Sequence, residues 1–211
     1  MIRLGTLLVA VAVAGAAGCA PRAAPRAAAA TATAVVAPAA DPQARAQAAM
    51  AAFSGKLRSE LGAVIQRDGP LEAIDFCRVQ APRIADQVMA EHGVRLGRVA
   101  VPGRQRNPGN TAHGWQAEAL QDFQAAVTAG AAPEAQVRLL RDGLPEGVAL
   151  RAVRGIRVEP ACLMCHGASV APALAERIAQ RYPDDRATGF AEGDLRGAIW
   201  AEVTRSEPES R

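Results

Sequence analysis

Residues 159–167 read Glu159-Pro160-Ala161-Cys162-Leu163-Met164-Cys165-His166-Gly167. They contain the spacing C-x-x-C-H, which is the attachment pattern of c-type haem. In that chemistry two thiols add to two vinyl groups of the macrocycle, and the next residue places an imidazole under the iron. Two intervening residues let the backbone make one turn, which delivers His166 from below. The spacing predicts one covalent haem c on Cys162 and Cys165, with His166 as the proximal iron ligand.

Three other chemistries also use closely spaced cysteines. A redox-active C-x-x-C suits a βαβ unit in which a helix begins after the first cysteine, and Pro160 and the strand pattern described below argue against it. A zinc site could combine Cys77, Cys162, Cys165 and His166, a legitimate set of three cysteines and one histidine. A structural disulfide is the third alternative. Haem attachment is preferred because an export signal accompanies the motif.

The N-terminal region predicts export. Arg3 precedes an apolar stretch at 4–17 that is too short and too rich in small residues for a membrane span. It ends in Ala16-Ala17-Gly18-Cys19, which resembles the lipobox of bacterial lipoproteins, with Ala16 in place of the usual leucine. We predict a lipoprotein-type signal peptide over 1–18 and lipidation of Cys19, with plain cleavage near Ala17 as the alternative. Ala20 replaces the aspartate that retains lipoproteins in the inner membrane, so we expect a periplasmic protein on the outer membrane.

The composition divides the rest of the chain into a tether and one domain. Residues 19–40 are almost entirely Ala, Pro, Arg and Thr, cannot bury a core, and are predicted to be a disordered tether. Residues 41–206 remain for a single domain. Half of the 211 residues are apolar but only 3% are aromatic, so a prosthetic group would help to fill the core. The net charge is +3 without basic runs interleaved with aromatics, and we expect no nucleic-acid binding.

Hydrophobic periodicity predicts helices first and strands later. Helices are expected from Pro42 to about Arg67 and from Pro70 to Gly93, with a kink or split at Pro82. A strand over 94–101, a loop over 102–111 and a helix over 113–129 follow. Further strands are expected at 137–140, 149–158 and 194–203, and a short helix at 171–181. The absence of βαβ alternation favours an α+β fold with an antiparallel sheet.

The sixth ligand of the iron has several candidates in the sequence. They are Cys77, His92, His113, Met50, Met89 and Met164. Met164 lies inside the attachment turn and cannot reach the other face of a haem. The other two methionines fit a helix core, His92 fits a helix end, and His113 fits the surface. Cys77 shares an apolar helix face with Ala73, Ile74, Ala81, Ile84 and Val88. The other three cysteines are assigned to lipidation and to the haem thioether bonds, so the Cys77 thiol is expected to be either buried in the core or a ligand of the iron.

Four stretches carry a resemblance to a known family. They are Ala73-Ile74-Asp75-Phe76-Cys77 with Ala81-Pro82, Arg106-Asn107-Pro108-Gly109-Asn110, the segment 162–167, and Tyr182-Pro183-Asp184-Asp185-Arg186-Ala187-Thr188-Gly189 with Gly193-Asp194-Leu195-Arg196-Gly197. In order and spacing the chain resembles single-haem c-type domains with a PAS-like fold, over about residues 53–203. Such domains are known from a cyanobacterial photosystem II-associated haem protein and from sensor regions of bacterial kinases and chemoreceptors.

The resemblance implies a fold and a ligand set. The fold would be a PAS-like antiparallel sheet with flanking helices that enclose one c-type haem, and Cys77 would be the distal iron ligand opposite His166. The loop that contains Arg106 could border the haem, and we expect a propionate contact from Arg106, with ordinary turn chemistry as the alternative. The segment 182–189 is read as a helix stop and a turn, without a chemical role.

Thiolate and imidazole ligands together would leave no open position on the iron, so we expect no enzymatic activity. An anionic sulfur also stabilises ferric iron, which predicts a low reduction potential. We therefore expect electron transfer with a redox partner protein or membrane complex. Sensing of redox state or of NO or CO is the alternative, and because the sequence ends at Arg211 without an output module, a sensor would signal through a separate partner. A structural haem lipoprotein that docks onto a larger complex is a third possibility.

Overall fold

The described structure begins with two long helices. The computed structural model describes residues 41–205, so the predicted signal peptide, the lipidation of Cys19, the tether and residue 206 lie outside the described residues. Helix α1 (Pro42–Asp68) begins where the Asp41 carboxylate accepts a hydrogen bond from the backbone N–H of Ala44 at 3.0 Å. Helix α2 (Pro70–His92) follows and ends at Gly93, which adopts a left-handed conformation with φ 60°.

The predicted split of α2 at Pro82 is wrong. The helix runs through Pro82 without interruption. A proline removes the hydrogen bond to the carbonyl four residues earlier, which belongs to Arg78. Both Arg78 and Pro82 are exposed, so water can bind this carbonyl and the helix continues.

An antiparallel sheet of four strands follows, in the order β1-β4-β3-β2. The strands are β1 (Val94–Ala100), β2 (Val137–Leu140), β3 (Val148–Arg157) and β4 (Leu195–Thr204). The remaining helices are α3 (Trp115–Thr128), α4 (Leu163–His166) and α5 (Pro172–Arg181), and 3₁₀ turns span Pro108–Asn110, Pro133–Ala135 and Pro160–Cys162. The α+β class with an antiparallel sheet is confirmed, and each predicted helix and strand ends within two residues of its observed end.

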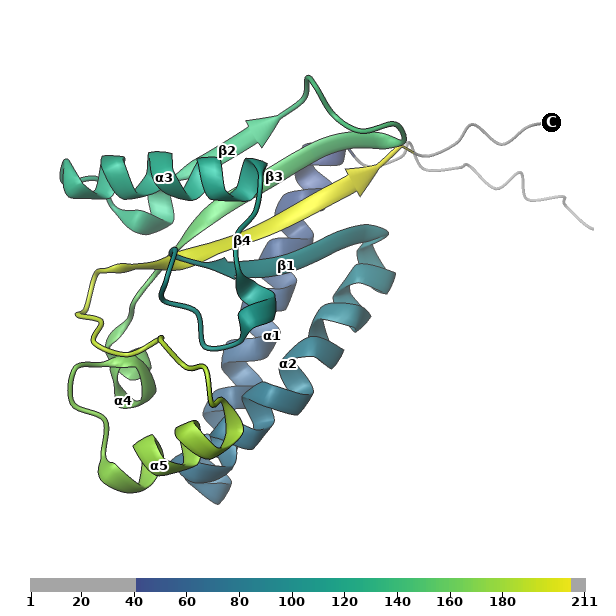
Figure 1. Ribbon diagram of the computed structural model, residues 1–211. Coiled ribbons are helices and arrows are strands. Elements are labelled where there is room, and N and C mark those ends of the chain that lie inside the picture. The colour runs from purple at the N-terminus through teal and green to yellow at the C-terminus, as the bar shows by residue number, and fades with distance from the viewer. Residues whose placement is uncertain (1–40, 206–211) are drawn as a thin grey trace, which may run out of the picture. The chain divides into compact units, whose positions relative to one another are not determined.

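The sheet has a hydrophobic core on each face. Helices α1 and α2 cover one face, where Phe53, Val88, Leu150 and Ile199 belong to the main core. Helix α3 covers the other face through a smaller core that includes Leu120 and Phe123. Figure 1 shows α4, α5 and the following loop beyond one end of the sheet, with α5 beside α2. Within residues 41–205, no helix is both long enough and apolar enough to cross a membrane.

Candidate functional site

The C-x-x-C-H motif forms a single compact turn after β3, and residues 162–166 are called the attachment turn. The 3₁₀ turn at Pro160–Cys162 leads directly into α4, a helix of one turn. Cys162 and Cys165 are both partly buried at the two ends of this turn. The turn closes through a hydrogen bond from the Gly167 N–H to the Leu163 carbonyl at 2.8 Å, and a Cβ on residue 167 would lie 2.6 Å from the same oxygen. The backbone turn expected between the two cysteines is therefore present, and it requires Gly167.

The structure weakens the three alternatives to haem attachment. Cys77, Cys162 and Cys165 are free thiols, so none of the described cysteines forms a disulfide. A helix does begin after Cys162, but it has one turn and the sheet is antiparallel, unlike a thioredoxin-like βαβ unit. A zinc site would require at least three of its four proposed ligands to converge, and within residues 41–205 no three His, Cys, Asp or Glu side chains do so.

The imidazole of His166 is held in one orientation. Its Nδ1 lies 2.7 Å from the carbonyl oxygen of Ala187, and because a carbonyl can only accept, Nδ1 donates. The lone pair therefore lies on Nε2, which is the arrangement of a metal-binding histidine. Burial, followed by the nearby Arg106 and Arg196 cations, lowers the pKa of His166 to about 3. The ring is neutral at ordinary pH, as an iron ligand must be.

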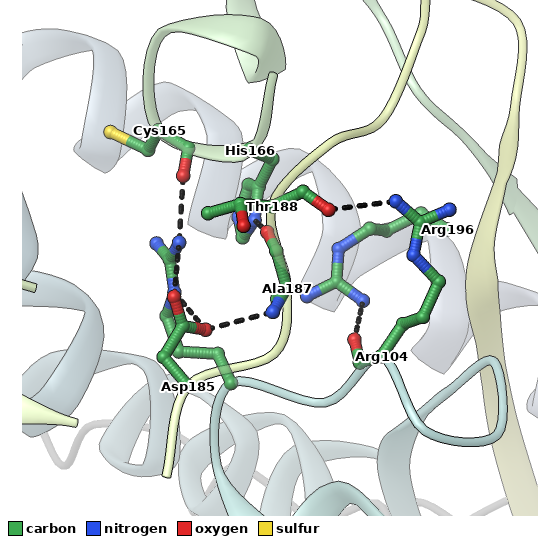
Figure 2. Close-up of polar contacts among 8 residues, drawn as sticks. Arg104, Cys165, His166, Asp185, Ala187, Thr188 and Arg196 are labelled. Atoms are coloured by element: carbon green, nitrogen blue, oxygen red, sulfur yellow. Dashed lines mark hydrogen bonds and ion pairs between the residues drawn. The ribbon is translucent and has the colours of Figure 1, made fainter. Parts of the chain in front are cut away.

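The segment 185–190 holds the attachment turn in place. Besides the contact from Ala187, the N–H of Phe190 donates to the His166 carbonyl at 2.9 Å, and the N–H of Gly189 donates to the Gly167 carbonyl at 2.9 Å. Figure 2 shows His166 beside this segment. Sequence analysis gave the segment no chemical role, and no local signal could have done so, because every residue carries a backbone carbonyl.

Arg106 links the same segment to the attachment turn. Its Nε donates to Asp185 Oδ1 at 3.0 Å, and its Nη2 donates to Asp185 Oδ2 at 3.3 Å and to the Cys165 carbonyl at 2.7 Å. The two side chains are only 13% and 10% exposed. Arg106 thus lies beside the C-x-x-C-H turn, and its predicted propionate contact stays a prediction. Asp185, which sequence analysis missed, also accepts the Ala187 N–H at 3.0 Å.

Cys77 lies on α2 in the neighbourhood of the attachment turn. Cys165 packs against a small cluster formed by Ile74, Leu174 and Ile178, and Ile74 is one helical turn before Cys77. Burial raises the pKa of the Cys77 thiol, and the nearby Arg98 partly offsets this by favouring the thiolate. The structure thus brings α2, α5 and the attachment turn together around these two thiols.

The other candidates for the sixth ligand lie elsewhere or at the surface. Met50 is buried in the main core and Met89 packs against it, as predicted. His113 is exposed, and Met164 is 42% exposed. His92 lies in the last turn of α2, about 22 Å along the helix from Cys77 at the usual rise per residue.

The sequence predicted no function for three arginines that lie around this site. Arg104 donates to the Thr188 carbonyl at 2.7 Å and lies over the Phe190 ring, with its guanidinium carbon 3.5 Å from the ring centre. Arg196 donates to the Arg104 carbonyl at 3.2 Å, as Figure 2 shows. Arg98 lies on β1 near Cys77. They were missed because isolated arginines in a chain with 24 Lys and Arg residues give no signal in the sequence.

Together these features define a class of small α+β domain. In this class a turn with the C-x-x-C-H motif is held by an arginine-rich loop, beside two long helices. The Tll0287-like family model matches residues 26–203, so the chain belongs to the Tll0287-like family. This confirms the resemblance found in the sequence.

A solved structure has the same fold. It is the crystal structure of the cyanobacterial heme-protein Tll0287, which this chain matches with a TM-score of 0.55 and 23% sequence identity. The match covers 80% of this chain and 99% of the Tll0287 chain. A comparison with curated proteins gave no match.

Proposed function

We propose that this chain is a c-type haem protein that transfers electrons in the periplasm from a lipid anchor on the outer membrane. The observation that carries the proposal is the orientation of His166, whose Nδ1 donates to the Ala187 carbonyl and leaves Nε2 for a metal. Membership of the Tll0287-like family supports it, since the solved relative is a heme-protein.

The residues of the site fit a covalently attached haem. Two free, partly buried thiols flank one helical turn, and the next residue is the oriented histidine. Apolar side chains for a macrocycle are present beside Cys165, namely Ile74, Leu174 and Ile178. When bound, the haem would supply a one-electron ferric–ferrous couple. Cys162 and Cys165 would hold it by thioether bonds, and His166 would be its proximal ligand.

Cys77 is proposed as the distal ligand. It lies on the α2 segment next to Cys165, and a nearby cation such as iron lowers the pKa of a thiol and holds it as thiolate. If Cys77 and His166 were both ligands of the iron, no position would stay open for a substrate, which favours electron transfer over catalysis. The negative charge of the sulfur favours the ferric state and a low potential.

Covalent attachment is tested on protein from a host that matures c-type cytochromes. Wild type should stain for haem on a denaturing gel, and the Cys162→Ser, Cys165→Ser double variant should not. Cys77→Ser is the matched control, because it removes a thiol from the same site and should retain the stain. Colourless wild-type protein, or protein that carries zinc, would refute the proposal.

Axial ligation is tested by the ferric electron spin resonance spectrum. Cys77→Ser should change the spectrum from that of a thiolate–imidazole iron, whereas His113→Ala, at an exposed position, should leave it unchanged. An unchanged spectrum in Cys77→Ser removes Cys77 as the ligand. Rapid binding of NO or CO to the reduced wild type, with loss of the thiolate ligand, would favour sensing instead of electron transfer.

The proposed anchor is tested by fractionation. Cys19→Ser should move the protein from the membrane fraction to the soluble periplasm while the haem spectrum stays the same. Unchanged membrane association in Cys19→Ser would contradict lipidation at this residue.

A further inference from the structure

Arg98 is a partly buried cation that has no counter-ion within the described part of the chain. On β1 it alternates with Val94 and Leu96, so its side chain lies on the sheet face that α1 and α2 cover. Its guanidinium carbon lies 5.4 Å from the centre of the Phe53 ring on α1. Burial lowers the pKa of Arg98. None of the side-chain hydrogen bonds or ion pairs formed within residues 41–205 uses this guanidinium, although a charge that is partly withdrawn from water is stabilised by a partner.

Arg196, the second arginine without a counter-ion, lies at a β-bulge in β4. Ile156 on β3 pairs with Gly197, and the next residue, Arg157, pairs with Leu195, so Arg196 is the extra residue. A bulge of this kind changes the direction in which the side chain of the extra residue leaves the sheet. At the same point β4 and β1 approach so closely that a Cβ on Gly197 would lie 2.1 Å from the Val99 carbonyl oxygen.

The Arg196 guanidinium is also without an acidic partner among residues 41–205. Its hydrogen bond goes to the neutral carbonyl of Arg104, and its guanidinium carbon lies 5.0 Å from the Phe190 ring centre. Burial, and then the neighbouring Arg106 and Arg98, lower its pKa to about 10, so it stays a cation at neutral pH. Arg196 thus lies within the positive field of Arg106 and Arg98, and an anion near these side chains would relieve the repulsion.

The carboxylate available nearby is already used. Both oxygens of Asp185 bind Arg106, which also holds the Cys165 carbonyl. Tyr182 does not supply an anion, because burial raises its pKa to about 12. Asp185 is thus taken up by Arg106 and does not balance the charge of Arg98 or of Arg196.

We propose that Arg98 and Arg196 bind the two propionate carboxylates of the haem, while Arg106 serves as the structural counter-ion of the attachment turn. The inference rests on the proposed function, since it needs the haem to be present. A haem brings two carboxylates to the region where two guanidiniums lack partners. The planar guanidinium fork matches a carboxylate with two parallel hydrogen bonds, which a lysine cannot reproduce.

The test uses the haem-loaded full chain and three charge-removing variants. They are Arg98→Gln, Arg196→Gln and the matched control Arg83→Gln, an exposed arginine on α2. The resonance Raman bands of propionate bending report hydrogen bonds to these groups. They should shift in Arg98→Gln and in Arg196→Gln but not in Arg83→Gln. Covalent attachment keeps the haem on every variant, so loss of loading does not obscure the result.

The reduction potential gives a second measurement. Loss of a cation near the haem favours the ferric state, so each site variant should shift the ferric–ferrous equilibrium at least tenfold, which is 59 mV for one electron. The exposed Arg83→Gln control should not shift it. Arg98→Lys retains the charge, so its potential should be that of the wild type while its propionate bands should still be shifted. This variant replaces Arg98→Gln if Arg98→Gln does not fold.

Unchanged propionate bands in haem-loaded Arg98 and Arg196 variants would overturn this assignment even if the potential moved. That result would leave the proposed function intact, because the wild type would still carry its haem. Colourless wild-type protein would instead refute the proposed function itself.

Discussion

At the scale of single residues, Asp185 joins two parts of the site. It binds Arg106 through both carboxylate oxygens and accepts the Ala187 N–H, and Ala187 in turn holds His166. The orientation of the histidine thus depends on a carboxylate that does not touch it. A backbone carbonyl accepts the imidazole proton here, in the position where other metal sites use a carboxylate.

Replacement of Asp185 is therefore expected to destabilise the fold. Asp185→Ala leaves the Arg106 cation nearly buried without its partner, and loss of one partner from a buried pair costs about 3 kcal/mol. Urea denaturation of the Asp185→Ala variant measures this as a lower free energy of unfolding. The control is Asp184→Ala at the exposed neighbouring position, which should change it by less than about 0.5 kcal/mol. Equal effects of the two substitutions would contradict the structural role of Asp185.

Gly197 gives a second prediction at this scale. It has φ 152°, and a Cβ would meet the Val99 carbonyl oxygen of the neighbouring strand, so Gly197→Ala should lower the free energy of unfolding by about 2–3 kcal/mol. Gly62 on α1 has open space around its Cβ position, and Gly62→Ala should stabilise the protein by about 0.5–1 kcal/mol through the helix propensity of alanine. Thermal unfolding measures both, and a tolerated Gly197→Ala would show that the strands can separate at the bulge.

At the scale of elements, one carboxylate joins three neighbouring strands. Glu202 on β4 is only 6% exposed and accepts from Arg95 of β1 at 3.1 Å and from Arg151 of β3 at 2.8 Å. The three residues are paired in register across the sheet. The two arginines differ, since the Arg95 side chain is 71% exposed and that of Arg151 is 18% exposed.

This difference predicts unequal effects of removing the two arginines. Arg95→Ala should lower the free energy of unfolding by less than about 1 kcal/mol, as for an exposed ion pair. Arg151→Ala should cost about 2–3 kcal/mol, because it removes the mostly buried partner of a buried carboxylate. Chemical denaturation of both variants is the measurement. A larger loss for Arg95 than for Arg151 would contradict the argument from burial.

At the scale of the whole described structure, the functional site lies where the hydrophobic core is thinnest. The two faces of the sheet bury large clusters under α1, α2 and α3. The site end has two satellite clusters, one around Leu174 and one around Phe190, each with three buried residues. Local unfolding is easiest where few apolar contacts are buried.

Hydrogen exchange should therefore depend on haem in one region. In the Cys162→Ser, Cys165→Ser double variant, amides of residues 159–190 should exchange through local opening, faster than those of β3 and β4. The proposed covalent haem would add a large apolar group to this region, so it should slow their exchange in the wild type, with little change in the central strands. Uniform protection in both proteins would show that the site folds with the main cores and does not need the haem.

The sequence alone predicted the ends of the helices and strands, apart from the split at Pro82, and the single turn that carries Cys162, Cys165 and His166. Helix and strand ends follow local rules, such as Asp41-Pro42 at the start of α1 and Gly93 at the end of α2, which act within a few residues. The spacing of Cys162, Cys165 and His166 is also local, because one helical turn sets it. The apolar face of α2 that carries Cys77 follows from helical periodicity.

The tertiary structure alone decided what surrounds that motif. The Ala187 carbonyl that orients His166 and the Asp185 carboxylate that binds Arg106 come from a segment about twenty residues away, which only folding brings beside the motif. The unbalanced charges of Arg98 and Arg196 depend on strand register and on a bulge, neither of which has a signature in composition or periodicity. The physical reason is that a short motif sets its own geometry through covalent bonds and local hydrogen bonds, whereas its electrostatic surroundings depend on which distant segments pack against it.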